Sequence, residues 1–448
     1  MDATHLATLR RLDEASFLHP FTDHVDLHRQ GTHIIQEASG CWVTDETGRR
    51  LFDGLAGLWC VNVGYGRREI ADAVHRQMTA VCYYPSFFNT TTEPTILLAD
   101  KLRSLAPTGL RKVFFSNSGS EANETALKLI RAYQKLRGKV GKTKILTRTF
   151  SYHGVGMATT SMTGLPACYL PFDLPLAGFI HVPGPHPYGV NSERSPGEYA
   201  EWCLAETERV IESEGAATIA ALFAEPVQGA GGVIVPPAGH LRALRDLCHR
   251  HDILFVADEV ITGFGRLGAW FASVIWDLEP DLLTMAKGIT SGYVPLGGTM
   301  VSDEIAATLE GAGYLAHGFT YSGHPVATAA GLANLAILEG EGLPARVRDD
   351  VGPYFQQQLH AVAGHPAVGE VRGHQLIGAI ELLPRGGRAA LQSPPLLGAK
   401  AVALCRDKDV IVRGIRDLIA MSPPLIVTHA EIDHLFAAVT HMLDHLWD

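Results

Sequence analysis

The chain has 448 residues, enough for two domains, and its 46% hydrophobic and 19% charged residues are ordinary for a globular protein. A net charge of −10 argues against nucleic acid as the main partner, and no apolar stretch reaches the length of a transmembrane helix. The seven cysteines include no Cys-x-x-Cys pair and the N-terminus carries acids, which excludes a disulfide framework, a zinc site and a signal peptide and fits a cytoplasmic protein.

The predicted elements begin with two short strands around a Thr-Gly turn in residues 40–57. Helices follow at 67–81 and 95–106, and from residue 112 short apolar runs alternate with amphipathic helices. The runs predict strands at 112–117, 143–148, 220–227, 253–260 and 282–286, and the helices lie at 120–138, 198–213 and 237–252. This alternation predicts an α/β fold, in which helices cover both faces of a mostly parallel sheet.

After about residue 325 the pattern changes. A helix at 325–342 leads into strands at 368–383 and 409–415 and then into a final helix, which predicts a smaller α+β domain. We therefore divide the chain into an N-terminal segment, a large domain and a C-terminal small domain, with bounds at 1–60, 61–325 and 326–448.

Lys287 is the first candidate for chemistry. No other lysine occurs between Lys144 and Lys400, and the residues before Lys287 form an apolar strand. A charged amine there is costly in free energy unless it is neutralised, paired or used. One interpretation is a buried stem whose head reaches water; the other is an amine that takes part in a reaction.

A second candidate lies where a strand passes into a helix, in SNSGSEANE at 116–124. Ser118, Gly119 and Ser120 place small residues and hydroxyls at a helix N-terminus, where backbone N–H groups and the helix dipole favour an anion such as phosphate. The same residues would also serve as an ordinary helix cap without any ligand.

Two acids, Asp258 and Glu259, end the apolar strand at 253–260. Ligands of open α/β sheets bind beyond the carboxyl ends of strands, so a carboxylate there is well placed to act, although a solvated strand end is the simpler interpretation. Gly263-x-Gly265-x-x-Gly268 matches the dinucleotide fingerprint and keeps an NAD-dependent oxidoreductase open as an alternative, but it does not directly follow a strand or open a clear helix. None of the 21 histidines falls in His-Glu-x-x-His, so we expect no metal.

Together these features suggest one cofactor. A lone lysine can form a Schiff base with an aldehyde, a carboxylate can hold a pyridine nitrogen protonated, and a helix N-terminus can bind phosphate. Those are the requirements of pyridoxal phosphate.

Four stretches resemble the class III aminotransferases of the fold-type I pyridoxal-phosphate superfamily, and the likeness extends over nearly the whole chain. They are FAEPVQGAGGVIVPP, VADEVITGFGRLG, MAKGITSGYVPLGG and HGFTYSGHPVATAAGL. HPFTD, GLWCVNVGYG and VIVRG with the later MSPPL are similar to the ω-transaminase subgroup, the β-alanine or amine:pyruvate aminotransferases. The resemblance implies a homodimer with shared active sites, or a dimer of dimers, and an N-terminal segment that joins the small domain and the active-site entrance.

The resemblance also implies roles for individual residues. Lys287 would be the Schiff-base lysine and proton shuttle, and Asp258 would pair with the pyridine nitrogen. Further cofactor-binding residues would be Ser118, Gly119, Ser120, Tyr152, His153, Glu225, Val260, Ile261, Phe319 and Thr320, with Thr320 reaching the neighbouring subunit's phosphate. The substrate-binding residues would be Phe21, Trp59, Phe88, Tyr152 and Arg413.

One position departs from the ornithine-type members, where a Gln contacts the phenolic oxygen of the cofactor; here it is Ile261. This favours the pyruvate-dependent group. We expect an aminotransferase that moves an amino group from a primary amine or ω-amino acid to pyruvate by a ping-pong mechanism. The alternatives are a diamine or 4-aminobutyrate aminotransferase, a dialkylglycine decarboxylase and an aminomutase.

Overall fold

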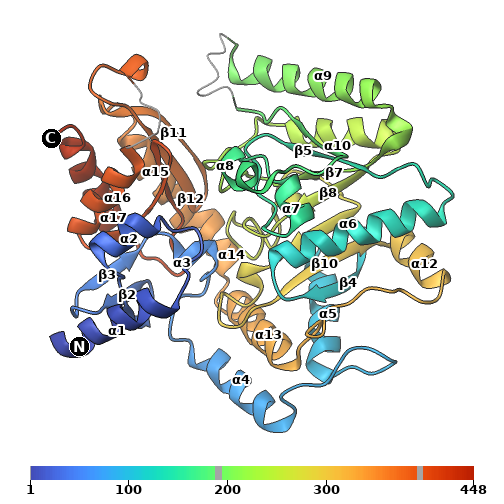
Figure 1. Cartoon of the computed structure of the whole chain (residues 1–448), viewed down its shortest axis with the longest axis horizontal. Coiled ribbons are helices and arrows are strands. Elements are labelled where there is room, and N and C mark those ends of the chain that lie inside the picture. Colours follow the sequence, from blue (N-terminus) through green and yellow to red (C-terminus); the bar gives the residue numbers. More distant parts are fainter. Residues whose placement is uncertain (1, 187–193, 391–396) are drawn as a thin grey trace.

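The computed structural model describes residues 2–186, 194–390 and 397–448 (Figure 1). Its largest sheet has seven strands. In spatial order they are β4 (Leu110–Ser116), β10 (Gly297–Ser302), β9 (Leu282–Met285), β8 (Leu254–Asp258), β7 (Ile219–Ala224), β5 (Lys144–Arg148) and β6 (Phe179–Val182). From β9 to β6 neighbouring strands are parallel, whereas β10 is antiparallel to both β4 and β9.

Helices cover this sheet on both faces, as its sequence predicts. Alternate residues of one strand point to opposite faces. Ala221 and Phe223 of β7 pack in one apolar cluster with α6 (Gly119–Leu136), whereas Leu222 and Ala224 pack in another with α9 (Pro196–Glu214) and α10 (His240–Arg250). The predicted α/β class with a mostly parallel sheet is therefore confirmed.

Further helices belong to this part of the molecule (Figure 1). They are α4 (Arg68–Ala80), α5 (Glu93–Leu105), α7 (Met157–Met162), α8 (Pro166–Tyr169), α11 (Ala272–Ile275), α12 (Asp303–Gly311) and α13 (Pro325–Gly340). Short 3₁₀ turns lie at Leu170–Phe172, Ala216–Thr218 and Lys287–Ile289.

Two four-stranded sheets form the other part of the molecule. One is antiparallel and comes from the C-terminal region, with β11 (Val368–His374), β12 (Ile377–Leu382), β15 (Leu418–Met421) and β14 (Arg413–Ile415) in this order. The other joins the two ends of the chain, because β1 (Ile35–Ser39), β2 (Trp42–Asp45) and β3 (Arg50–Asp53) are completed by β13 (Val410–Ile411). The N-terminal strands thus pair with a C-terminal one, while the proposed domain bounds at residues 60 and 325 stay a prediction.

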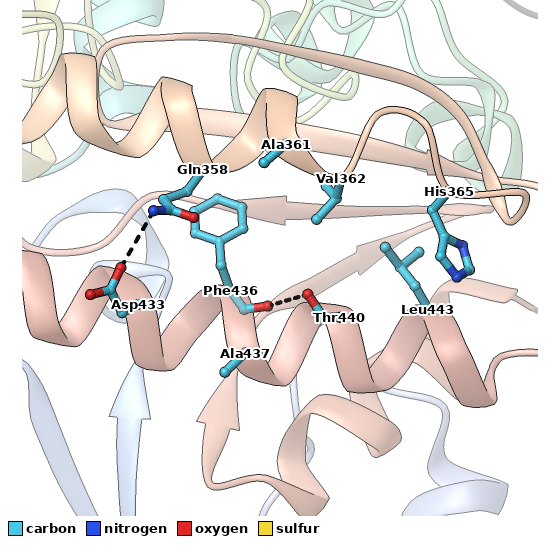
Figure 2. Close-up of a pocket in the computed structure, with 9 residues that line it drawn as sticks. All are labelled: Gln358, Ala361, Val362, His365, Asp433, Phe436, Ala437, Thr440 and Leu443. Atoms are coloured by element: carbon cyan, nitrogen blue, oxygen red, sulfur yellow. Dashed lines mark hydrogen bonds between the residues drawn. The ribbon is translucent and has the colours of Figure 1, made fainter.

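Helices cover these sheets as well. They are α1 (Ala3–Ser16), α2 (His24–Gln30), α3 (Ala56–Trp59), α14 (Leu343–Arg346), α15 (Gly352–Ala361), α16 (Leu397–Asp407) and α17 (His429–His445), with a π turn at Val347–Val351 and a 3₁₀ turn at Arg388–Ala390. A groove between α15 and α17 is lined by Val362, Phe436 and Leu443, among others (Figure 2). None of the predicted site residues lines this groove. Within the described ranges, no helix is both long and apolar enough to cross a membrane.

The glycines that match the dinucleotide fingerprint lie where the two parts of the molecule pack against each other. Gly265 and Gly268 have positive φ angles of 93° and 87°, and added Cβ atoms would lie 2.8 Å from Leu425 and from Arg348. Between them the buried Arg266 donates to the carbonyl oxygen of Pro423. These glycines therefore allow close packing against the C-terminal region, and nothing in their surroundings requires a dinucleotide.

Candidate active site

The carboxyl ends of the parallel strands bring most of the predicted residues to one edge of the large sheet. Asp258 ends β8, Glu225 follows β7, and Tyr152 lies four residues after β5. Lys287 comes two residues after β9, and β4 leads into Ser118 at the start of α6. This is the edge at which open α/β sheets bind ligands.

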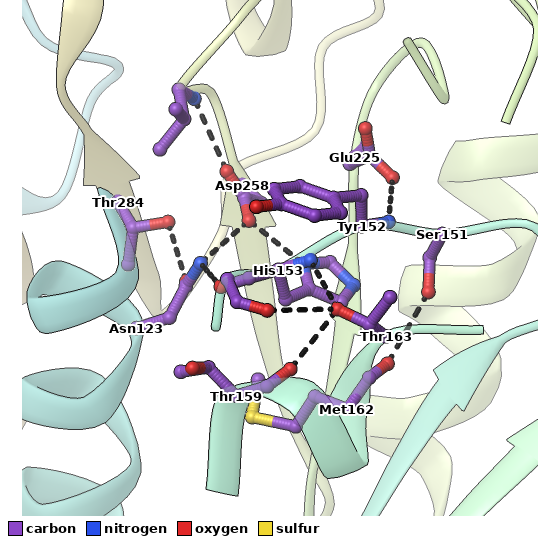
Figure 3. A network of polar contacts seen from close by, with 12 residues as sticks. Asn123, Ser151, Tyr152, His153, Thr159, Met162, Thr163, Glu225, Asp258 and Thr284 are labelled. Carbon is purple, nitrogen blue, oxygen red and sulfur yellow. Dashed lines mark hydrogen bonds and ion pairs between the residues drawn. The ribbon is translucent and has the colours of Figure 1, made fainter. Parts of the chain in front are cut away.

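Asp258 is buried and held by three groups (Figure 3). Its Oδ2 accepts a hydrogen bond of 2.8 Å from Asn123 Nδ2 and lies 2.7 Å from His153 Nδ1, and its Oδ1 accepts from the Val260 backbone N–H at 3.2 Å. Asn123 is in turn fixed by Thr284, whose hydroxyl donates to Asn123 Oδ1 at 2.9 Å. These contacts hold the carboxylate in one orientation, and the buried pair of Asn123 and Thr284 supports it.

Sequence reasoning did not assign Asn123. The signal for it was present, because Gly119, Asn123 and Leu127 recur every four residues and so lie on one face of α6. A polar side chain on a helix face that is otherwise buried needs a partner, and here the partner is Asp258.

Glu225 is buried beside Asp258 and accepts two backbone hydrogen bonds. Tyr152 N–H donates to Oε1 at 2.9 Å and Gly229 N–H donates to Oε2 at 3.0 Å. Burial raises the pKa of Glu225 to about 7, with smaller opposing effects from His153 and Arg148. Figure 3 shows the Tyr152 side chain beside Asp258.

The start of α6 offers donors to an anion. Ser118 caps the helix by accepting from the Glu121 N–H at 3.1 Å, so its hydroxyl is engaged, whereas the N–H groups of Gly119 and Ser120 fall in the first turn, which lacks partners within the helix. A Cβ on Gly119 would lie 3.0 Å from Val260 Cγ1. The lack of a side chain on Gly119 thus lets Val260 approach the helix start.

Lys287 is half-buried and adopts a left-handed φ of 48°, unusual for a residue with a side chain. Burial lowers the pKa of its amine, and the positive charge of Arg413 adds to this effect. Its Nζ lies 5.9 Å from the centre of the Trp59 ring, and Arg413 Cζ lies 5.9 Å from the same ring. Trp59 is itself buried with a φ of 62°, which indicates backbone strain concentrated at this site.

The other predicted residues differ in position. Ile261 is buried and packs in one apolar cluster with Trp59. Phe21 and Phe88 are 77% and 85% exposed, so neither lines a pocket within a single chain. Thr320 is also exposed, and its carbonyl oxygen accepts from the Tyr83 hydroxyl at 2.8 Å. Phe319 lies beside it and is half-buried.

These groups fit pyridoxal phosphate. The N–H groups at the start of α6 suit a phosphate, Asp258 suits a protonated ring nitrogen, and the Lys287 amine has a lowered pKa suited to reaction with an aldehyde. Among the residues that the structure describes, no hydrogen bond or ion pair engages the Lys287 amine. Fold and site together define a pyridoxal-phosphate enzyme.

Comparison with known proteins places the chain in a family. It belongs to the class-III aminotransferases, whose family description matches residues 26–443. It is 41% identical to a putrescine–pyruvate aminotransferase of Pseudomonas aeruginosa, over 95% of this chain and 94% of that protein. The chain is thus an aminotransferase that uses pyridoxal phosphate, as the sequence predicts.

The solved structures that this chain resembles are also transaminases. An (S)-enantioselective omega-transaminase from Thermomicrobium roseum is 44% identical, with a TM-score of 0.95 and 99% of each chain covered. An omega transaminase from Pseudomonas jessenii in complex with PMP is 37% identical, with a TM-score of 0.94 and 98% of each chain covered.

Proposed function

We propose that this aminotransferase moves the amino group of a primary amine or ω-amino acid to pyruvate, giving alanine and an aldehyde or ketone. The observation that carries the proposal is Arg413. Its guanidinium is half-buried beside the Trp59 ring, burial lowers its pKa, and within the described ranges it forms no ion pair, including none with Glu225. A half-buried cation without an ion-pair partner is suited to bind a carboxylate such as that of pyruvate.

The residues divide the work of the reaction. Pyridoxal phosphate supplies an aldehyde that carries the amino group and a ring that withdraws electrons. Asp258, aligned by Asn123 and His153, would hold the ring nitrogen protonated. The Lys287 amine, whose pKa is lowered by burial, would take the proton from the substrate carbon and hold it on its nitrogen for return.

The apolar wall around Ile261 supports an amine donor. Ile261 packs with Trp59 and Leu55 in one buried apolar cluster. A hydrocarbon group of an amine can lie against this wall, whereas a second carboxylate would be left without a partner there. Relatives of this chain are named for two different acceptors. One is the putrescine–pyruvate aminotransferase, and another, 39% identical and from Halomonas elongata, is a diaminobutyrate–2-oxoglutarate transaminase.

A panel of donors tests the function. Purified enzyme with pyridoxal phosphate is given propylamine, benzylamine, putrescine, β-alanine and 4-aminobutyrate, each with pyruvate and separately with 2-oxoglutarate. We expect alanine from pyruvate without release of carbon dioxide. Glutamate as the main product, or formation of carbon dioxide, would contradict the proposal.

A first prediction concerns Arg413→Ala. The half-reaction with pyruvate should weaken by about 2–4 kcal/mol, because one partner of a buried charge pair is lost. Deamination of propylamine, which has no carboxylate, should stay within a few-fold of wild type. The two half-reactions are measured separately by single-turnover absorbance.

Arg416→Ala is the matched control for this prediction. Arg416 lies three residues further along the chain and donates to the carbonyl oxygen of Gly231 at 3.4 Å, which gives it a packing role. It should affect both halves equally. Equal loss in both halves for Arg413→Ala as well would mean that Arg413 supports the fold instead of binding pyruvate.

We propose further that two copies of the chain form the active sites together. The Tyr83 and Tyr321 rings are in contact, and the chain segments that carry them also carry exposed large apolar side chains. These are Met78, Val81, Tyr84, Phe88, Ile96, Leu97, Tyr314 and Leu315. A partner that covers exposed apolar side chains would stabilise the assembly, and a second copy would bring Phe88, Phe319 and Thr320 to the neighbouring site.

Sedimentation velocity of the purified protein tests this assembly. We also propose a cytoplasmic location, which the seven free cysteines support. We expect a dimer or a dimer of dimers. A monomer with full activity would rule out shared sites.

A further inference from the structure

Gly229 lies directly against the Trp59 ring. A Cβ added at Gly229 would lie 2.0 Å from Trp59 Cζ3 and 2.6 Å from Ile261 Cδ1, well inside the closest approach of real carbon atoms. The chain can therefore hold Trp59 in its present place only while residue 229 has no side chain. Since Lys287 and Arg413 lie 5.9 Å from the ring, its position sets the space between them.

The backbone of Gly229 is held by a carboxylate that also holds the backbone of Tyr152. Glu225 Oε2 accepts from Gly229 N–H at 3.0 Å, and Oε1 accepts from Tyr152 N–H at 2.9 Å. Glu225 is 3% exposed, so neither hydrogen bond competes with bulk water. One buried side chain thus connects the segment under Trp59 with the segment that carries the Tyr152 ring.

We propose that Glu225 is a positioning residue that sets the width of the donor pocket by fixing Tyr152 and the segment under Trp59 together, and that Gly229 determines which donors fit. This inference rests on the proposed function, because it concerns the pocket for the amine. It assigns the choice of donor to backbone geometry as well as to the side chains that touch the substrate.

Only an ionised carboxylate suits both bonds equally, because each of its oxygens accepts. The charged groups that act on Glu225 are Arg148 and His153, which favour its ionised form, and Asp258, which opposes it, while burial raises the pKa of Glu225 to about 7. The carboxylate also favours the charged amine of Lys287. At pH 8 the ionised Glu225 accepts from the N–H groups of both Tyr152 and Gly229. Protonation below neutral pH removes one of these two acceptors.

Glu225→Gln at pH 8 is the first test. An amide offers one acceptor oxygen, and its NH₂ group faces the other backbone donor. Hydrogen exchange of cofactor-loaded protein should therefore speed up at least about tenfold in peptides that contain Tyr152 and Gly229. The ratio of kcat/KM for benzylamine to that for propylamine should change by at least about tenfold, because both walls move.

Glu259→Gln is the matched control. Glu259 is also fully buried, follows the next strand of the same sheet, and accepts from the Ala272 N–H at 2.9 Å, the Ser273 N–H at 2.6 Å and the Thr262 hydroxyl at 2.5 Å. Among the described residues, no hydrogen bond joins it to Tyr152 or Gly229. It should speed exchange around Ala272 and leave the ratio between donors unchanged. If Glu225→Gln leaves exchange at Tyr152 and Gly229 and the ratio between donors as in wild type, the inference is wrong.

Gly229→Ala is the second test and does not depend on the fate of Glu225→Gln. The methyl group should push the Trp59 ring into the pocket, so benzylamine should lose at least about tenfold more kcat/KM than propylamine. Gly141→Ala, where an added Cβ meets nothing within 4 Å, is the control and should match wild type. Equal losses for the two donors would overturn the role of Gly229.

These outcomes are separable from those for the proposed function. The identity of the acceptor is decided in the wild-type enzyme, and if 2-oxoglutarate proves to be the acceptor, the variants are compared with 2-oxoglutarate. Exchange at Tyr152 and Gly229 requires no acceptor at all.

Discussion

Replacement of Lys287 by alanine should leave a protein that folds and binds pyridoxal phosphate but transfers amino groups at least about 10⁴-fold more slowly, since general acid–base catalysis alone contributes up to about that factor. Asp258 and the start of α6 remain, so cofactor affinity should fall far less than turnover. Stopped-flow absorbance with propylamine measures the rate, and equilibrium dialysis measures the cofactor. Turnover near that of wild type would remove Lys287 from the mechanism.

Thermal unfolding separates loss of chemistry from loss of structure. Burial lowers the pKa of Lys287, so at neutral pH the folded chain holds the charged amine less readily than the unfolded chain does. Lys287→Met, which keeps an apolar stem, should therefore raise the Tm of the cofactor-free protein at pH 7. The gain should shrink as the pH approaches 10.5, the ordinary pKa of lysine, because both states then lose the charge. A gain that is independent of pH would contradict this explanation.

The sequence predicted the large sheet well where a strand is a short, fully apolar run between two helices. The strands β5, β7, β8 and β9 are short apolar runs flanked by helices, and their buried residues match the predicted ranges. The antiparallel β10 was missed, because its first three residues, Gly297, Gly298 and Thr299, offer little apolar signal. The pairing of β13 with β3 joins residues more than 350 positions apart, and no local pattern encodes such a contact.

The site was predictable in its residue types and less so in its geometry. The lone lysine and the acid at a strand end indicated Lys287 and Asp258, and the chain brings both to the same edge. The left-handed φ of Lys287 had no signal, because strain is imposed by the surrounding packing. Phe21, Phe88 and Thr320 are exposed in one chain, so their proposed roles depend on a second copy, which sequence patterns alone do not place.

Asp258→Asn is the second change from which we expect a large effect. In wild type, the Oδ2 atom of Asp258 accepts a hydrogen bond from Asn123 Nδ2 at 2.8 Å and lies 2.7 Å from His153 Nδ1. An amide either turns its NH₂ group toward these neighbours, which places donor against donor, or turns it toward the cofactor, where it can no longer hold a proton on the ring nitrogen. Loss of one hydrogen bond to a charged group should weaken cofactor binding by about 1.5–3 kcal/mol, and deprotonation of the donor should slow further because the ring withdraws electrons less strongly.

Thr284→Val separates the charge of Asp258 from its alignment. Thr284 pairs with Asp258 through the sheet backbone, but its hydroxyl donates to Asn123 Oδ1 at 2.9 Å, so valine removes this support and keeps the carboxylate. If the charge dominates, Thr284→Val should reduce the rate of donor deprotonation by less than about tenfold, the effect of one lost neutral hydrogen bond, whereas Asp258→Asn should reduce it by far more. Equal losses would mean that alignment by the buried network, and not the negative charge, is what Asp258 contributes. Unchanged rate and cofactor affinity in Asp258→Asn would leave it as a buried acid at a strand end with no part in the reaction.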